Sequence, residues 1–551
     1  MEAQDNIIKY IEQTLRDNWN LEAFTNFHGT TYLYRDVARK IAKIHIMFRK
    51  AGIAKGDRVA FCGANSAEWA VAFLASLTYG TVSVPILNDF KPETIHHLVN
   101  HSGARVLFTD AHIWSKLSPD DMPELVAVVL NTDYSLLLSR SKSIDRARSN
   151  LNKYFGEEYP ERFTAADISY CSPAAGDLAL INYTSGSMGF SKGVMLSYDN
   201  LWSNVQYSID GLDFLKPGDT MLSMLPMAHM YGLMIEVIHP FVKGCHIFFL
   251  NRTPSPKVIM EAFAEVRPKL VVAVPLIIEK IVRTRIFPLL DKPLMKVLLH
   301  LPFVDSHLLA KVKKGLADAF GGNLLELIIG GAPLSKDVET FLRKIQFPYT
   351  VGYGMTECGP LVAYAPWDIQ RPASCGKIVP RMEARIDSPD PANVPGVLWV
   401  RGRNVMKGYY RNDEATKAVF DADGWMNTGD ICQIDADGFV YIRGRDKNMI
   451  LGPSGQNIYP EEIEVKLSTM PYVAECLVVD RGGRLTALVV PDLDLTQRQK
   501  VGDSELSDIM KQDITALNHD LPSYSQISDV EIMKEEFEKT PKRSIKRYLY
   551  K

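Results

Sequence analysis

The sequence lacks the features that mark secreted and membrane-spanning proteins. Its seven cysteines are an odd number, lie far apart and form no Cys-x-x-Cys pair, which argues against a disulfide framework or a zinc ribbon. The first residues are polar and acidic, unlike a secretory signal. The longest apolar run, residues 270–278, contains Pro275 and is shorter than the roughly 18 residues of a spanning helix. We therefore expect a soluble, cytoplasmic protein with reduced thiols and no transmembrane segment.

An excess of charge of either sign is also absent. The chain has 62 Lys and Arg against 65 Asp and Glu, a formal net charge of −3. This balance argues against a nucleic-acid-binding surface and against a long disordered acidic chain. What is present is 551 residues, 46% of them hydrophobic, enough to form the cores of several domains.

The order of apolar runs indicates an α/β protein. Short β-branched runs alternate with helical patterns over the first third of the chain, and the same pattern resumes from about 177 to 350. Such alternation predicts mainly parallel sheets with helices on their faces. One helix is expected to be capped by Asn65-Ser66 and to end at Gly80.

A change of pattern follows in the last third of the chain. Residues 376–443 contain short strands and turns, which predicts a β-rich lobe. After Arg445 the chain restarts with helical patterns around a hairpin expected over 475–491. We predict a large N-terminal domain (1–445) of two α/β lobes plus this β-rich lobe, and a small α+β C-terminal domain (446–551).

The most informative stretch is a loop of small and polar residues that follows an apolar run and ends at Lys192. Glycines let backbone N–H groups approach an anion, hydroxyls add donors, and a lysine adds positive charge, which together suit a triphosphate. Ser191 before Lys192 excludes a Walker A loop. The alternative is a plain surface turn. The candidate phosphate-binding residues are Thr184, Ser185, Gly186, Ser187, Gly189 and Lys192.

Four further motifs follow this loop. They are residues 330–334 after an apolar strand, residues 352–357, residues 427–430, and residues 444–447, which lead into 455–464. Taken singly, each is equally typical of a turn or of solvated charges in a linker.

Together, these motifs resemble the adenylate-forming superfamily, which includes acyl-coenzyme A synthetases, firefly luciferase and peptide-synthetase adenylation domains. Residues 183–193 are similar to its Tyr-Thr-Ser-Gly-Thr-Thr-Gly-x-Pro-Lys-Gly loop, and the later motifs follow in the family's order. Met188 and Ser191 depart from the pattern, and Met188 removes one hydroxyl donor. The resemblance extends over nearly the whole chain.

The resemblance implies a role for each matching residue. Gly331, Ala332 and Pro333 would line the adenine, and Tyr353 would stack on it. Thr356 would bind phosphate.

The remaining matches concern the metal, the ribose and the domain boundary. Glu357 would hold Mg²⁺, and Asp430 would accept the ribose hydroxyls. Arg445 would contact ribose or phosphate. Lys447 corresponds to the hinge about which a mobile C-terminal domain turns.

The acyl side is indicated by residues 225–232, which look like the Leu-Pro-x-x-His segment of fatty acyl-coenzyme A synthetases. It implies that His229 lies near the acyl carboxylate, with Tyr231 beside it. Residues 274–281 resemble a segment of long-chain members. Methionines between 221 and 234 would suit an alkyl chain, although such a stripe is more often plain core.

The last motif departs most from the family pattern. Residues 538–547 align with the terminal motif whose lysine contacts the acyl carboxylate and the α-phosphate, but Ser544 stands at that position. Lys542 or Lys546 could reach the site instead, and a solvated basic tail is the alternative.

The sequence thus predicts an ATP-dependent ligase that adenylates a fatty acid and transfers the acyl group to coenzyme A, with ATP, Mg²⁺ and coenzyme A as cofactors or co-substrates. Two alternatives stay open: an acyl-AMP or acyl-carrier-protein ligase, and a non-catalytic acyl- or nucleotide-binding relative. The length of the acyl chain, the oligomeric state and peripheral contact of the basic tail with a membrane are also open.

Overall fold

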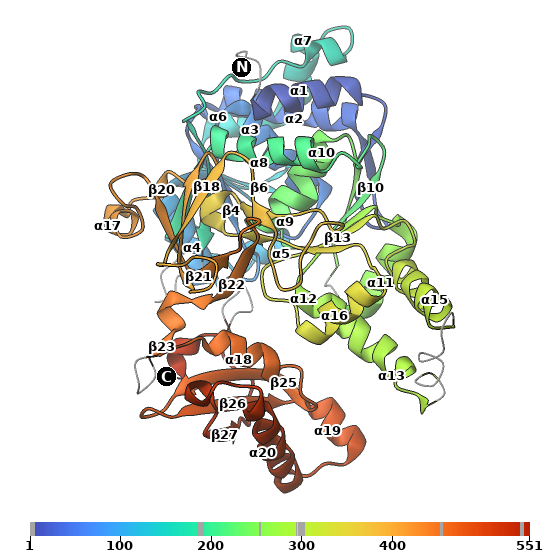
Figure 1. Cartoon of the computed structure of the whole chain (residues 1–551). Coiled ribbons are helices and arrows are strands. Elements are labelled where there is room, and N and C mark those ends of the chain that lie inside the picture. The colour runs from blue at the N-terminus through green and yellow to red at the C-terminus, as the bar shows by residue number, and fades with distance from the viewer. Residues whose placement is uncertain are drawn as a thin grey trace.

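The chain folds into a large N-terminal part and a small C-terminal part, shown one above the other in the computed structural model of Figure 1. The structure describes residues 6–184, 192–252, 255–293, 295, 304–451, 456–539 and 545–550. The mixed α/β class and the division into a large N-terminal and a smaller C-terminal domain are confirmed.

The first lobe is built on a sheet with the strand order β20-β9-β8-β4-β3-β5-β6-β7 among the described residues. Strands β8, β4, β3, β5 and β6 pair in parallel, as the sequence predicts, whereas β9, β20 and β7 add antiparallel edges. The strands are β3 (Arg58–Cys62), β4 (Val82–Ile86), β5 (Ala104–Thr109), β6 (Ala127–Leu130), β7 (Leu136–Ser139), β8 (Leu178–Thr184), β9 (Lys192–Ser197) and β20 (Gly408–Tyr409). The helices of this region are α2 (Tyr34–Ala51), α3 (Ala67–Tyr79), α4 (Pro92–Ser102), α5 (Ala111–Trp114), α6 (Lys142–Ser149) and α7 (Leu151–Glu158).

Helix α3 illustrates how local sequence sets these elements. The Ser66 side chain accepts a hydrogen bond from the backbone N–H of Trp69 at 3.2 Å, which satisfies one free donor of the first turn. Gly80 ends the helix with a φ of 94°, a left-handed conformation that glycine adopts without steric cost. Both ends of the helix lie where the sequence predicts them.

The second lobe is built on a sheet with the order β14-β13-β12-β10-β11-β1-β2, parallel except for the β1–β2 edge. Its strands are β1 (Glu22–Asn26), β2 (Thr31–Leu33), β10 (Thr220–Ser223), β11 (His246–Phe249), β12 (Leu270–Ala273), β13 (Glu326–Ile329) and β14 (Tyr349–Val351). The helices around it are α1 (Ile7–Asp17), α8 (Tyr198–Gly211), α9 (Met230–Gly232), α10 (His239–Val242), α11 (Pro256–Val266), α12 (Pro275–Ile281), α13 (Phe287–Leu290), α15 (Val304–Ala319) and α16 (Lys336–Lys344).

The β-rich lobe consists of an antiparallel sheet, β18-β19-β21-β22, and a smaller one, β15-β16-β17. A turn at Asp437-Gly438 joins β21 to β22. The elements are β15 (Tyr353–Gly354), β16 (Leu361–Tyr364), β17 (Lys377–Ile378), β18 (Met382–Asp387), β19 (Gly396–Gly402), α17 (Asp413–Lys417), β21 (Met426–Ile434) and β22 (Val440–Arg445).

The C-terminal part has its own hydrophobic core, which includes Ile463, Val478 and Met510. The predicted hairpin is formed by β25 and β26, and β27 joins it in parallel. The elements are β23 (Ile450–Leu451), β24 (Asn457–Ile458), α18 (Pro460–Leu467), β25 (Val473–Asp480), β26 (Leu485–Pro491), α19 (Leu493–Gln499), α20 (Asp503–His519) and β27 (Asp529–Ile532). Strand β22 ends at Arg445, and the domain boundary after it stays a prediction.

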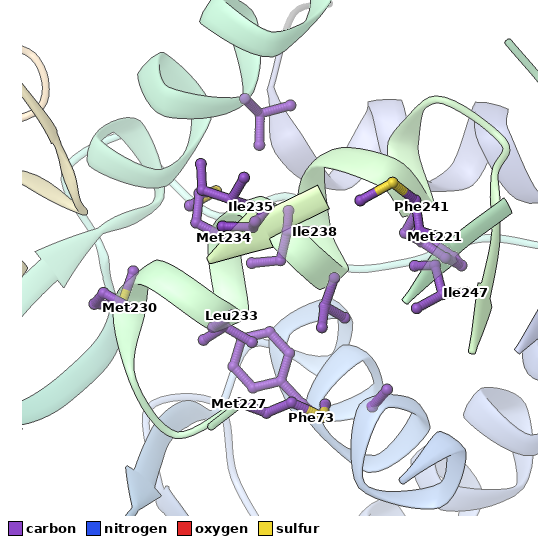
Figure 2. Packing of buried hydrophobic residues seen from close by; sticks show 14 of the residues in the cluster. Phe73, Met221, Met227, Met230, Leu233, Met234, Ile235, Ile238, Phe241 and Ile247 are labelled. Atoms are coloured by element: carbon purple, nitrogen blue, oxygen red, sulfur yellow. The ribbon is translucent and has the colours of Figure 1, made fainter. Parts of the chain in front are cut away.

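The methionines between residues 221 and 234 belong to the core. Figure 2 shows Met221, Met227, Met230 and Met234 packed among aliphatic and aromatic side chains, and each is at most 2% exposed. Met224 is 7% exposed. This packing favours the core alternative for the stripe, and other residues line the cavity described below.

The structure shows the state of the cysteines and the character of the described helices. Each of the seven cysteines is a free thiol, and all but Cys171 are buried. Within the described ranges, no helix is both long enough and apolar enough to cross a bilayer.

We predict that Phe241→Ala destabilises the N-terminal domain. Phe241 is fully buried, and its ring lies 5.4 Å from Phe24 and 5.2 Å from Tyr34 between ring centroids. Truncation leaves a cavity that costs about 3–5 kcal/mol. Thermal unfolding should therefore begin several degrees lower than in the wild type. Leu276→Ala is the matched control, because Leu276 is 64% exposed; equal effects of the two changes would contradict this packing.

Candidate active site

A cavity of about 90 Å³ lies at the carboxyl ends of β13 and β14 in the second lobe. Ligands of open parallel sheets bind at this edge, where loops leave the strands. Its wall is shared by helices α8 and α10, the loops after β13 and β14, and strand β16. The lining residues used below are Tyr207, His229, Tyr231, His239, Gly330, Gly331, Tyr353, Thr356, Leu361 and Tyr364.

The loop after β13 lies against a tyrosine ring. A Cβ at Gly330 would come within 2.9 Å of the ring and hydroxyl of Tyr231, so only glycine fits there without displacement. Gly331 lines the cavity with a φ of 86°. Ala332 and Pro333 follow directly and are solvent-exposed. The segment predicted to line adenine thus borders the cavity through Gly331.

Three predicted residues from separate segments meet at one carboxylate. The Tyr353 hydroxyl donates to Asp430 Oδ2 at 2.5 Å, and Arg445 Nε lies 2.7 Å from Asp430 Oδ1. The Asp430 side chain is 4% exposed, whereas that of Arg445 is 47% exposed. Asp430 therefore lies at the wall of the site with a donor on each oxygen, and each oxygen keeps further lone pairs for another donor.

Burial governs the electrostatics of this cluster. It raises the pKa of the Asp430 carboxyl above its usual value, while Arg445 and the Tyr353 hydroxyl oppose the rise by stabilising the carboxylate. Burial, together with the negative charge of Asp430, also raises the pKa of Tyr353 well above its usual value. Tyr353 is therefore a neutral hydrogen-bond donor at physiological pH.

A second cluster joins Lys192 to Glu357 through a tyrosine. Lys192 Nζ lies 4.7 Å from the centroid of the Tyr409 ring, and the Tyr409 hydroxyl donates to Glu357 Oε1 at 3.1 Å. Glu357 belongs to a 3₁₀ turn, Thr356–Cys358, whose first residue lines the cavity. Tyr409 therefore contacts a cation through its ring and a carboxylate through its hydroxyl.

The candidate phosphate loop connects β8 to β9. Thr184 and Lys192 are the last backbone partners of this antiparallel pair. Ser185, Gly186, Ser187 and Gly189 lie outside the described residues. The sequence predicts mainly parallel pairing in this lobe, but β8 and β9 pair antiparallel, because the seven residues between them are too few for the crossover that a parallel pair needs.

The two predicted acyl-side residues line the same cavity. His229 Nδ1 accepts a hydrogen bond from the backbone N–H of Tyr231 at 3.3 Å. The Tyr231 hydroxyl donates to the backbone oxygen of Ile328 at 3.3 Å, and burial raises its pKa. The adenine-side and acyl-side motifs, which are about 100 residues apart in the chain, therefore share one cavity.

Sequence reasoning missed several residues of the site. Tyr409 lies in a short Gly-Tyr strand without a motif that the sequence analysis used, and His239 lies in an apolar run that indicates only a buried helix. Tyr207 and Tyr364 meet across the cavity, with ring centroids 5.7 Å apart. Each is contributed by tertiary packing, and no local pattern distinguishes them from core residues.

The carboxyl group of Glu326 lies behind the cavity wall. Glu326 is 2% exposed, accepts a hydrogen bond from the backbone N–H of Trp367 at 3.0 Å, and lies beside Tyr364. Burial raises the pKa of Glu326 to about 7, and the neighbouring hydroxyl and N–H donors only partly offset this.

The predicted hinge and tail residues follow β22 in the chain. Lys447 is exposed in a 3₁₀ turn, Asp446–Asn448, that follows β22. Lys546 Nζ pairs with Glu538 Oε2 at 3.0 Å, and Lys542 lies outside the described residues. Asn448 donates to Glu461 of α18 at 2.6 Å, which links the hinge turn to the first helix of the C-terminal part.

The fold and the cavity define a two-part α/β protein with a candidate ligand site at the carboxyl ends of parallel strands. The profile of the AMP-binding enzyme family matches residues 11–410, and that of the AMP-binding enzyme C-terminal domain matches residues 447–550. The chain therefore belongs to the AMP-binding enzyme family, the adenylate-forming superfamily that its motifs resemble.

Individual relatives act on different acids. The chain is 30% identical over 473 residues to the long-chain-fatty-acid–CoA ligase FadD15 of Mycobacterium bovis, covering 81% of this chain and 74% of that protein. It is 29% identical over 469 residues to 4-coumarate–CoA ligase 5 of Oryza sativa subsp. japonica, covering 82% and 77%.

Solved structures agree with the fold. The anthranilate CoA ligase AuaEII in complex with anthranoyl-AMP matches with a TM-score of 0.79 at 19% identity, over 100% of this chain and 97% of that one. The family is thus one of acyl- and aryl-CoA ligases, while the acid differs between relatives of similar identity.

We predict that Glu326→Gln changes the pH dependence of stability. Because the folded pKa is about 7 and the ordinary value is 4.5, the unfolded chain loses this proton first as the pH rises. Wild-type stability should fall between pH 4.5 and 7 by about 3 kcal/mol at most from this group, and remain level above pH 7. Glutamine keeps the acceptor for Trp367 but cannot ionise. Chemical denaturation at pH 5 and 7.5 should show the variant gaining on the wild type at the higher pH; a constant difference would refute the shifted carboxyl.

Proposed function

We propose that this protein is an ATP-dependent acid–thiol ligase, which adenylates a carboxylic acid and then transfers the acyl group to coenzyme A. The observation that carries the proposal is the shared cavity, which is lined by Gly331, Tyr353 and Thr356 and also by His229 and Tyr231. A site for both nucleotide and acid is what such a reaction needs. Membership of the family supports the same activity.

The chemistry explains why charged groups surround this cavity. A carboxylate is a poor electrophile, because a nucleophile would have to expel oxide. In the proposed first step, a carboxylate oxygen attacks the α-phosphorus of ATP; the new O–P bond replaces the bond to pyrophosphate, which leaves. Two anions must approach and charge develops on phosphoryl oxygens, so the catalyst is mainly electrostatic.

The described residues divide this work by position. Asp430 accepts the ribose hydroxyls, with Arg445 beside it, and Tyr353 stacks on the adenine. Lys192 and Thr356 bind the phosphates together with Thr184 and the loop that follows it. The neutral, hydrogen-bonded state of Tyr353 suits a stacking ring whose hydroxyl is fixed.

Glu357 is the proposed ligand for Mg²⁺. A carboxylate fits the way this ion is usually held, by one or two carboxylates together with substrate phosphate oxygens. When bound, Mg²⁺ neutralises charge on the phosphates. The hydrogen bond from Tyr409 fixes the carboxylate in orientation.

The second half-reaction involves the C-terminal domain, for which we propose the bounds 446–551. Its own core supports movement as a unit, and Lys447 lies in the turn that joins it to β22. Rotation there would present the acyl-adenylate to the thiol of coenzyme A, whose sulfur attacks the acyl carbon and releases AMP. We assign the tail-lysine role to Lys542 or Lys546; the latter would exchange its partner Glu538 for substrate.

The identity of the acid is the most specific part of the proposal. The sequence favours a fatty acid, and the relative from Mycobacterium bovis bears a name of that kind. The cavity of about 90 Å³ is lined by residues assigned to the nucleotide as well as by those assigned to the acid, so a panel of acids, and not this volume, identifies the substrate.

Pyrophosphate exchange tests the activity. Labelled pyrophosphate should enter ATP in the presence of a suitable acid, and added coenzyme A should give a thioester. Exchange without thioester would instead identify an acyl-AMP or carrier-protein ligase. Absence of exchange with every short, long, aliphatic and aromatic acid would leave a binding protein, the reading that Met188, Ser191 and Ser544 favour.

We predict that Glu357→Gln lowers the rate of adenylation by roughly 100-fold, because charge stabilisation at the phosphates is lost. Pyrophosphate exchange measures this step. Glu383→Gln is the matched control, since Glu383 pairs with Arg401 on an exposed face of the β-rich lobe. Thermal unfolding of both variants should match the wild type. Normal exchange in a folded Glu357→Gln protein would remove the metal role.

We predict that Asp430→Asn weakens ATP binding roughly tenfold or more. The change removes the negative charge and replaces one acceptor oxygen with an NH₂ group, which cannot accept a hydrogen bond from a ribose hydroxyl. Calorimetry with a non-hydrolysable ATP analogue measures the affinity. Asp435→Asn is the control, because Asp435 of the same lobe pairs with Arg371 instead. Equal affinity in the two variants would contradict the ribose role of Asp430.

A further inference from the structure

One buried side chain holds the backbone directly after Glu357. Asn204 of α8 is fully buried, and its amide faces the turn that contains Thr356 and Glu357. Its Nδ2 donates to the backbone oxygen of Cys358 at 3.1 Å, and its Oδ1 accepts from the backbone N–H of Leu361 at 3.0 Å. The side chain therefore fixes the chain at two points within four residues of the proposed metal ligand.

The Asn204 amide is itself held in one orientation. Its Nδ2 also donates to the backbone oxygen of Asn200, one turn earlier in α8, at 2.9 Å. Both N–H groups of the amide are thus used. A Cβ at Gly359 would lie 3.0 Å from Asn204 Nδ2, so the amide also packs directly against the backbone of the turn. The position of the turn relative to α8 is therefore well defined.

The same helix connects this turn with the strand that begins at Lys192. Strand β9 runs into α8 without an intervening residue. Asn200 of α8 donates to the backbone oxygen of Val405 at 2.9 Å, and the backbone N–H of Met406 donates to the backbone oxygen of Glu357 at 2.8 Å. Helix α8 thus supports the Glu357 segment directly through Asn204 and indirectly through residues 405–406.

The local strand pairing explains why a side chain is needed here. Leu361 is the first residue of β16, and the pairing of β15 with β16 is irregular beside it. Asn204 supplies the acceptor for the Leu361 N–H at this irregularity. Burying an amide costs free energy unless its groups are paired, and Asn204 meets this condition by pairing with the backbone after Glu357.

We propose that Asn204 is a positioning residue for adenylation, which holds the turn Thr356–Cys358 so that Thr356 and Glu357 keep the placement needed for phosphate and Mg²⁺. This inference rests on the proposed ligase function and adds a residue outside the motifs. Asn204 acts through the turn and does not touch substrate. It therefore matters for the first half-reaction, at the α-phosphorus. In the second, the thiol sulfur bonds to the acyl carbon and the C–O bond to AMP breaks, so no bond to phosphorus changes.

Asn204→Leu separates the two half-reactions. Leucine has a similar size but makes none of the three hydrogen bonds. Pyrophosphate exchange should fall roughly 10- to 100-fold, because small misplacements of catalytic groups have effects of this order. Thioester formation from supplied acyl-adenylate and coenzyme A should stay within about twofold of the wild type. An equal loss in both half-reactions, or a loss in neither, would overturn the inference.

Nucleotide binding gives a readout that does not depend on turnover. Calorimetry measures the affinity for an ATP analogue with a methylene bridge between the α- and β-phosphorus, once with Mg²⁺ and once with EDTA. Mg²⁺ should strengthen binding to the wild type. Asn204→Leu should lose most of this gain, while its affinity in EDTA changes much less. A gain from Mg²⁺ as large as in the wild type would contradict the role of Asn204.

Asn18→Leu is the matched control. Asn18 is 9% exposed, and its amide donates to the backbone oxygen of Thr14 at 2.9 Å at the end of α1, outside the cavity. This variant also loses a buried amide contact to the backbone, but it should keep both half-reactions and the gain from Mg²⁺. A selective loss of adenylation in Asn18→Leu as well would overturn the inference, because the effect would then be general.

Two further measurements apply if Asn204→Leu does not fold. Asn204→Asp keeps the shape and the acceptor for Leu361 but removes the donor to Cys358, so it should show the same selective loss of adenylation. Hydrogen exchange in the wild type needs no variant. The amides of residues 358–361 should be protected before any ligand is added, because Asn204 already holds the turn. Fast exchange that slows only when nucleotide binds would overturn the inference.

The two proposals fail in different ways. If the wild type shows neither exchange nor thioester with any acid, the ligase function fails and the inference fails with it. If the wild type is active and Asn204→Leu retains normal exchange and a normal gain from Mg²⁺, the ligase function stands and only the role of Asn204 is lost.

Discussion

The site depends most on the contacts that the Asp430 carboxylate makes with Tyr353 and Arg445. The carboxylate binds the Tyr353 hydroxyl with one oxygen and the Arg445 guanidinium with the other, and these residues come from β15 and from the end of β22. A buried charge is tolerated only when such partners surround it. The same three residues therefore connect the cavity wall, the β-rich lobe and the strand that leads to the C-terminal domain.

Charged residues and a cavity lining without charged side chains occur together in this region. Lys192 and Glu357 contact Tyr409, and Asp430 and Arg445 pair beside Tyr353, while the described lining of the cavity itself holds no lysine, arginine or carboxylate. A phosphate chain suits the charged residues, because anions need donors and cations. An acyl group suits the interior, whose described lining includes two histidines and four tyrosines. The border between the two environments is where a carboxylate would meet an α-phosphate.

Much of the fold follows from local sequence signals. The caps of α3, the buried strands of both lobes and the hairpin of β25 and β26 depend on short patterns with a direct physical cause. The motifs also indicated the residues that meet at the site, although Tyr353 and Asp430 are 77 positions apart. The order of the motifs can be read from one sequence, but the contact between Tyr353 and Asp430 is visible only in the folded structure.

Other features could not be predicted because no local pattern encodes them. Tyr409 reaches Glu357 only because β20 pairs with β9 at the edge of the first sheet. His239 lies in an apolar run in which a buried histidine and a cavity-lining one look alike. The methionines, by contrast, could be assigned to the core or to an alkyl site, and their packing favours the core.

The most direct test of the account follows oxygen from the acid to the nucleotide. An acid that supports turnover is labelled with ¹⁸O in both carboxylate oxygens, and the products with ATP and coenzyme A are analysed by mass spectrometry. Attack on the α-phosphorus followed by thiolysis predicts one ¹⁸O in the phosphate of AMP, with unlabelled pyrophosphate. Formation of ADP with ¹⁸O in inorganic phosphate, or of AMP without label, would contradict the proposed mechanism.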